Sequence, residues 1–137
     1  MAMMKGPRLW FGVRAGIVAL FIVNGFFVPF EGPEIPMFLP LLALVVVTLF
    51  VTFGFRGIMK SYAKYDWSRP SWFTNPFSGP SHFAHLGSWA FIALGLAETI
   101  RAIIVGQPVV IHLLPLAFGL GIYLGLTLFY TYMYEKK

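Results

Sequence analysis

Four long runs of apolar residues dominate the chain, at about residues 9–30, 38–56, 85–105 and 109–133. Each run reaches or nearly reaches the ~20 residues that a helix needs to cross about 30 Å of hydrocarbon. The runs are unbroken, whereas a transmembrane β-barrel requires apolar and polar residues to alternate. The pattern therefore predicts an all-α, polytopic integral membrane protein in which residues 1–137 form one transmembrane domain of four helices.

The connections between the runs suggest how these helices pair. A short connection follows the first run, and the tight turn Gly106-Gln107-Pro108 joins the third run to the fourth. Short connections favour antiparallel neighbours. We therefore expect a four-helix bundle made of two helical hairpins, with a longer loop at about residues 57–81 between them.

Pairs of small residues mark surfaces where helices can approach closely. Lipid tails are as apolar as leucine, so helices in a bilayer associate through close packing and polar contacts. Such pairs are Gly12 and Gly16, Ala93 and Ala97, and Gly121 and Gly125. The second run, LLALVVVTLFVTF, has almost no small residue. It is predicted to be a peripheral helix that faces lipid or a partner protein.

Composition and charge narrow the class further. Only 11% of the 137 residues are charged and 58% are hydrophobic, whereas soluble domains have about 25% charged residues. The absence of cysteine excludes disulfides, thiolate catalysis and cysteine-ligated metal sites. No basic, aromatic-rich soluble face is evident, so we expect no nucleic-acid partner.

The basic residues are distributed unevenly about the membrane. They gather before the first run, between the second and third runs, and at the end of the chain. The positive-inside rule then places both termini and the long loop in the cytoplasm, and the compact, loop-poor plan suggests a bacterial inner membrane. A cleaved signal peptide ending near Val23 and Gly25 is the alternative for the first run, but the run continues through Phe30, which favours an uncleaved helix.

The long loop opens with a basic stripe. Arg56, Lys60 and Lys64 are spaced four residues apart, so a continued helix places them on one face. Such a face is typical of an interfacial segment that lies against anionic lipid headgroups.

The rest of the loop is rich in aromatic residues and proline. Its aromatic residues include Trp67, Trp72, Phe73 and Phe77. This stretch is too aromatic for a free linker and too rich in proline for a regular helix. Two interpretations remain: the loop lies flat on the bilayer, or it is a docking surface for another protein.

Four polar residues interrupt the apolar runs toward the outer side. Glu98 and Arg101 are three residues apart and can pair on one helix face. The turn after the third run places His112 level with Arg101, and Asn24 of the first run lies at a similar depth. Together Glu98, Arg101, His112 and Asn24 form either a structural polar clasp or a proton, ion or anionic-ligand site, because intramembrane ionisable residues are costly and often functional.

Three further polar residues lie near the cytoplasmic side. His82 and His85 are three apart at the start of the third run, and Arg14 lies about one turn inside the first. The histidines suit a membrane interface, although together they can also ligate a metal, and either can bind a haem iron. His85 and His112 lie near opposite ends of their hairpin and cannot share one haem. We therefore predict no metal and no cofactor.

The expected function follows from these features and from missing enzyme signatures. The sequence contains no HExxH, GxSxG or P-loop motif. We expect a non-enzymatic accessory or assembly subunit of a membrane complex, in contact with the lipid bilayer and with a membrane-protein partner or further copies of itself. The alternative is a small homo-oligomeric transporter or channel that uses Glu98, Arg101 and His112.

Overall fold

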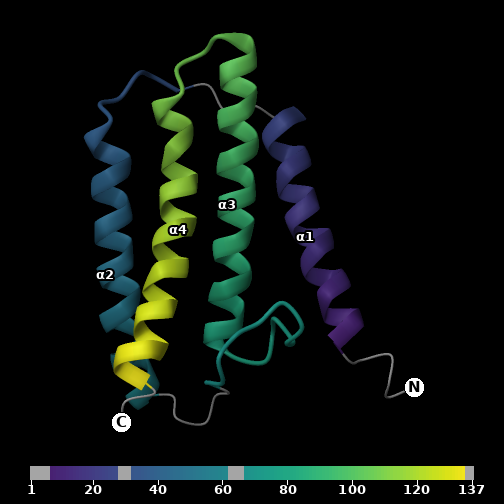
Figure 1. Cartoon of the computed structure of the whole chain (residues 1–137), viewed down its shortest axis with the longest axis vertical. Coiled ribbons are helices and arrows are strands. Elements are labelled where there is room, and N and C mark those ends of the chain that lie inside the picture. Colours follow the sequence, from purple (N-terminus) through teal and green to yellow (C-terminus); the bar gives the residue numbers. More distant parts are fainter. Residues whose placement is uncertain (1–6, 28–31, 62–66, 135–137) are drawn as a thin grey trace.

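The computed structural model describes residues 7–27, 32–61 and 67–134, and the regular structure within these ranges is entirely helical. The elements are α1 (Pro7–Phe27), α2 (Phe38–Ser61), α3 (Pro80–Val105), the 3₁₀ turn η2 (Val110–His112), α4 (Leu113–Leu128) and the π-helical segment η3 (Phe129–Tyr134), as shown in Figure 1. The predicted all-α class is confirmed.

Within the described ranges, four stretches are long and apolar enough to cross a membrane. They are Arg8–Phe27, Phe38–Ile58, Pro80–Val105 and Val110–Tyr134. The predicted spans are therefore confirmed in number and approximate position. α3 begins earlier than expected, at Pro80, because proline is well suited to the first helical turn. α2 also continues past the predicted span to Ser61, so the opening of the expected loop is helical.

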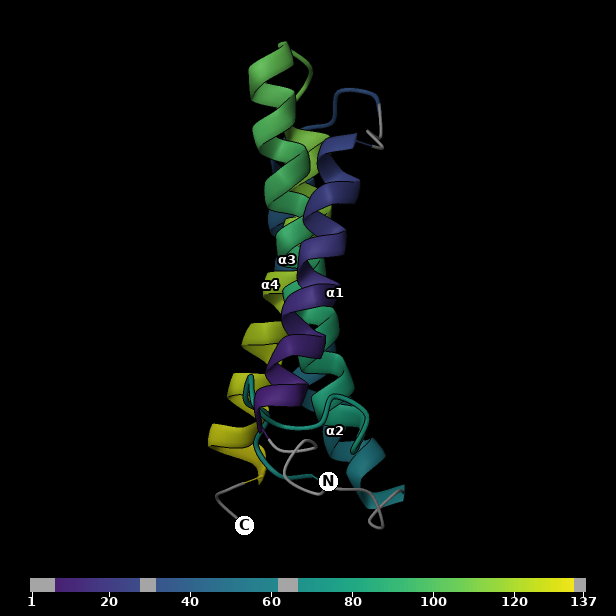
Figure 2. The same ribbon diagram turned by 90° about the vertical axis from the view of Figure 1, so that its right-hand side faces the viewer.

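The helices form a single open layer in the order α2, α4, α3, α1 (Figures 1 and 2). The close helix pairs are α3 with α4, α2 with α4, and α1 with α3. Within the described ranges, α1 and α2 do not pack along each other and occupy opposite edges. The first two helices therefore do not pack as the predicted hairpin, whereas α3 and α4 lie side by side, as the tight turn between them predicts.

Glycines explain why α2 packs on α4. An added Cβ at Gly121 would lie 2.8 Å from the Cβ of Val47, and one at Gly125 would lie 2.6 Å from the Cβ of Val51. The α2 valines thus occupy a surface that only glycine leaves open. Helix α2 is at an edge, as predicted, but it has its own packing residues: they are β-branched and fit the glycines of α4.

The α1 contact uses a different glycine from the one expected. An added Cβ at Gly25 would lie 2.7 Å from the Cβ of Ala97 on α3. Gly12 and Gly16 have no atom within 4 Å of the corresponding position. The predicted packing role of Gly12 and Gly16 is thus not seen among the described residues, while Ala97 has the role expected of it.

The layer has two ends, which we term the hairpin end and the loop end. The hairpin end holds the turn between α3 and α4, where Gly106 has a φ of 76° and its N–H donates to the Ala102 carbonyl. This left-handed conformation favours glycine and ends the helix. The loop end holds the start of α1, the end of η3 and the segment 67–79, which folds back onto the helices.

Replacing Gly125 by alanine should destabilise the fold. The new methyl group would collide with Val51 and with the Thr48 carbonyl, and overpacking of this kind costs roughly 1–3 kcal/mol. The measurement is the free energy of unfolding in detergent mixed with increasing SDS. Gly12→Ala is the matched control, because its methyl group meets open space and should leave stability equal or slightly higher. Equal losses for both variants would contradict the proposed packing.

Candidate functional site

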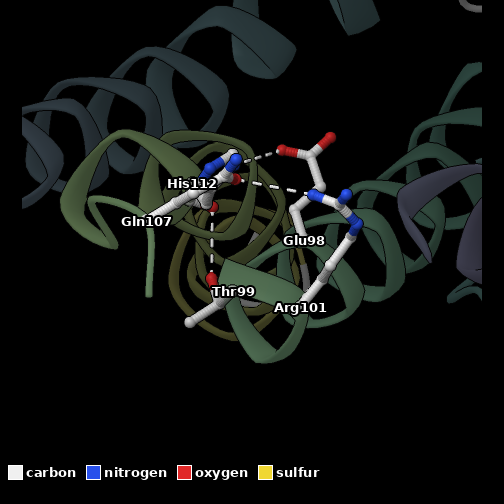
Figure 3. Close-up of polar contacts among 5 residues, drawn as sticks. All are labelled: Glu98, Thr99, Arg101, Gln107 and His112. Atoms are coloured by element: carbon white, nitrogen blue, oxygen red, sulfur yellow. Dashed lines mark hydrogen bonds and ion pairs between the residues drawn. The ribbon is translucent and has the colours of Figure 1, made fainter. Parts of the chain in front are cut away.

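A buried histidine and carboxylate pair at the hairpin end (Figure 3). His112 Nδ1 and Glu98 Oε1 are 3.0 Å apart. Glu98 is 7% exposed and His112 is 3% exposed. The 3₁₀ turn η2 ends at His112 and sets this ring beside α3. The His112 imidazole donates its N–H to the Glu98 carboxylate. This hydrogen bond satisfies the carboxylate, which would be costly to bury alone.

Arg101 takes a different partner from the one predicted. Its Nη1 donates to Gln107 Oε1 in the turn, at 3.5 Å, while Thr99 Oγ1 donates to the His112 carbonyl at 3.4 Å (Figure 3). The expected Glu98–Arg101 pair is therefore wrong. The physical reason is that η2 brings His112 to Glu98, while the long arginine side chain extends toward the interface.

Asn24 stays outside this cluster. Its side chain is exposed and makes no hydrogen bond within the described part of the chain. The neighbouring Gly25 is the residue that faces α3, and adjacent residues of a helix point about 100° apart. The expectation that Asn24 joins Glu98 and His112 is wrong for this reason.

Glu98 also lines a groove on one face of the layer. The groove has a volume of about 450 Å³, and its walls are otherwise apolar, including Ala43 of α2, Phe91 of α3 and Pro115 of α4. Glu98 of α3 and Pro115 of α4 thus border the same groove. A carboxylate held by one imidazole beside an open groove can hold a proton or exchange it with that imidazole.

A second cluster surrounds Arg14 at the loop end. The Arg14 side chain is 0% exposed. Its Nη1 lies 2.6 Å from His85 Nδ1, its Nη2 donates to the His82 carbonyl at 3.5 Å, and the guanidinium lies 5.9 Å from the centre of the Trp72 ring. Arg14 Nε is buried without a hydrogen-bond acceptor among the described residues. The sequence placed Arg14 near the histidines correctly, but gave no sign of its complete burial.

His85 faces two hydrogen-bond donors. Besides Arg14 on Nδ1, the Trp89 indole N–H points at His85 Nε2 at 3.1 Å. A neutral imidazole has one N–H and one acceptor nitrogen, so only one of these two contacts is a hydrogen bond in a given tautomer. Trp89 was missed as a partner because its four-residue spacing from His85 is equally usual for plain helix packing.

The two histidines point toward different neighbours. His82 Nε2 lies 3.3 Å from Ser68 Oγ in the folded-back segment, whereas His85 contacts Arg14 and Trp89. No group of three or more histidine, cysteine or acidic side chains with a metal-binding arrangement occurs among the described residues. The geometry thus directs both rings to protein partners.

The aromatic residues of the loop segment attach it to the helices. Trp67 is buried against Phe55 and Phe129, and the rings of Trp72 and Trp89 are 5.0 Å apart. Both predicted docking tryptophans are therefore part of the packed structure.

Phe73 and Phe77 remain accessible. They contact the rings of Phe11 and Trp10 on α1 but are 54% and 60% exposed. With Phe11 and Phe83, which are also largely exposed, they form what we term the aromatic patch: Phe11, Phe73, Phe77 and Phe83.

The predicted basic stripe is described only in part. Arg56 and Lys60 are exposed on the last turns of α2, one turn apart, as the spacing predicts. Lys64 lies outside the described residues. Both exposed cations lie at the loop end, on the opposite edge of the layer from α1.

Comparisons with protein families, with curated proteins and with solved structures find no match to this chain.

His112→Ala should destabilise the protein more than Glu98→Gln. The alanine leaves a buried carboxylate without its donor, at a cost of about 1–3 kcal/mol or more, whereas the glutamine oxygen can still accept from His112 Nδ1. The measurement is the free energy of unfolding in mixed micelles at neutral pH. If the two variants lose the same stability, the His112–Glu98 bond is not what holds η2 on α3.

Proposed function

We propose that this chain is a small, non-enzymatic accessory or assembly subunit of a membrane complex. We further propose that it lies in a bacterial inner membrane, with both chain ends and the segment 67–79 on the cytoplasmic side. The positive charges at the loop end support this orientation, because Arg56, Lys60 and Arg69 all lie there.

The open layer is the observation that carries the proposal. The buried share of the apolar stretch is 11% in α1 and 17% in α2, compared with 39% in each of α3 and α4. In the described part of the chain, a single layer of helices leaves two faces and two edges uncovered. Such a shape suits a protein that packs sideways against another membrane protein, through close fit and aromatic contacts.

The aromatic patch supplies a plausible contact surface at one edge. Its four phenylalanines come from α1, the loop segment and α3, and each is more than two-fifths exposed. Aromatic side chains are enriched at the contact surfaces of protein complexes. Trp72 of the segment packs on Trp89 of α3, and Phe73 and Phe77 pack on rings of α1, so the patch is presented by a folded surface.

The double variant Phe73→Ala/Phe77→Ala should lose a partner that co-purifies with the native protein in mild detergent. The readout is mass spectrometry of the material retained from native membranes. Phe50→Ala is the matched control, since Phe50 is 75% exposed on the opposite edge helix α2. Recovery of the native chain as a lone, monodisperse species after crosslinking would contradict the subunit proposal.

A second function is favoured by the groove that Glu98 lines. In a homo-oligomer, a second copy can cover this face and enclose the carboxylate beside His112, which creates a site for a proton or a cation. A small homo-oligomeric transporter or channel is therefore the alternative. The arrangement of Glu98 on a groove wall supports it.

Under this alternative, Glu98→Gln abolishes the pH-dependent flux of protons or cations across the membrane of liposomes that contain the protein, because glutamine cannot carry a proton. The variant should keep the native helix content, since the amide still accepts from His112. Arg101→Gln is the control: it removes a charge near the same turn but not from the groove. Unchanged flux in Glu98→Gln would remove Glu98 as the carrier.

A further inference from the structure

A small polar pocket lies at the loop end, between the folded-back segment and α4. It has a volume of about 90 Å³ and is open to the outside of the layer. Its lining residues are Arg69, Pro70, His85, Tyr123, Leu126, Thr127 and Tyr130. A water molecule needs about 10–15 Å³ in this measure, so the pocket has room for several waters or for one tetrahedral oxyanion.

The cation at its mouth is held in place. The Arg69 guanidinium lies 5.5 Å from the centre of the Tyr130 ring, and the Tyr130 hydroxyl donates to the Ser68 carbonyl at 3.0 Å. Tyr130 is buried, so the ring beneath Arg69 is fixed. A guanidinium on a fixed aromatic face is preorganised for the planar, two-point recognition of phosphate oxygens.

A second positive charge lies behind the pocket. His85 forms part of the wall, and its Nδ1 contacts the fully buried Arg14 at 2.6 Å. The Arg14 guanidinium is buried, and its Nε has no acceptor among the described residues. An anion in the pocket would offset this buried charge through a medium of low dielectric constant.

The pocket wall is suited to a lipid. Leu126 contributes a buried apolar side chain to the lining, and Tyr123 is 37% exposed, with its ring packed on Trp89. This site lies beside the first turns of α3 and the C-terminal half of α4, two helices that are long and apolar enough to cross a membrane. Basic pockets between such helices bind the headgroups of anionic lipids.

We propose that this pocket binds a phosphate group, with Arg69 as the direct contact, Tyr123 as a hydroxyl donor and Arg14 as the charge behind it. The location favours the phosphate of an anionic lipid such as phosphatidylglycerol over free phosphate. This inference does not depend on the proposed partner or on the Glu98 groove.

The test is native mass spectrometry of the full chain in detergent with equal amounts of phosphatidylglycerol and phosphatidylcholine. The native chain should retain phosphatidylglycerol preferentially, and Arg69→Gln should lower that preference about fivefold or more. Arg56→Gln is the matched control, because it removes an exposed charge at the same end without touching the pocket, and it should change nothing. An absent preference in the native chain, or equal losses in both variants, would overturn the proposal.

Two further measurements complete the test. Tyr123→Phe removes only the hydroxyl and should also weaken retention. If Arg69→Gln does not fold, this variant decides, with a loss supporting the site and full retention overturning it. Inorganic phosphate is then added to the native chain with its bound lipid, and persistence of the lipid assigns the site to the lipid headgroup. Displacement of the lipid by phosphate from both the native chain and Arg56→Gln assigns the site to phosphate from either source. Displacement from the native chain that is absent in Arg56→Gln would contradict a local site.

Discussion

The close approach of α4 to both of its neighbours is the constraint on which the rest of the structure depends. Gly95 of α3 and Gly119 of α4 face each other's helix backbones, while Gly121 and Gly125 receive the valines of α2. In a bilayer there is little hydrophobic gain from joining two apolar helices, so the gain must come from dense contact. Glycine at these positions permits that contact, and α4 becomes the central support of the layer.

The order of the layer then determines where the polar groups meet. Because α3 lies between α4 and α1, its two ends face different neighbours. Toward the hairpin end Glu98 meets His112 after the turn, and toward the loop end His85 meets Arg14 of α1. In the open layer each cluster lies against a groove or pocket that opens to the outside.

The loop segment completes the loop end by covering buried charge. Trp72 lies over the Arg14 guanidinium and against Trp89, and Trp67 fills the space beside η3. A buried arginine is tolerable only where its donors are largely satisfied and water is replaced by other favourable contacts. Trp72, which lies over Arg14, directly precedes Phe73 in the segment, so the packing inside this end and the aromatic patch outside it are coupled.

The sequence by itself determined the helical class, the number of membrane-spanning stretches and their approximate limits, because each depends on local composition and length. It also predicted that Glu98, Arg101 and His112 lie near one another, since a short turn fixes the register of two antiparallel helices. Only the tertiary structure decided which helices are neighbours, because every run is apolar on all sides and pairing depends on which small residue meets which larger one. For the same reason the sequence left open whether Glu98 pairs with Arg101 or His112, and whether the loop tryptophans face a partner or the chain's own helices. Side chains of that length have several partners within reach, and the choice depends on a 3₁₀ turn and a folded-back segment that residue spacing does not specify.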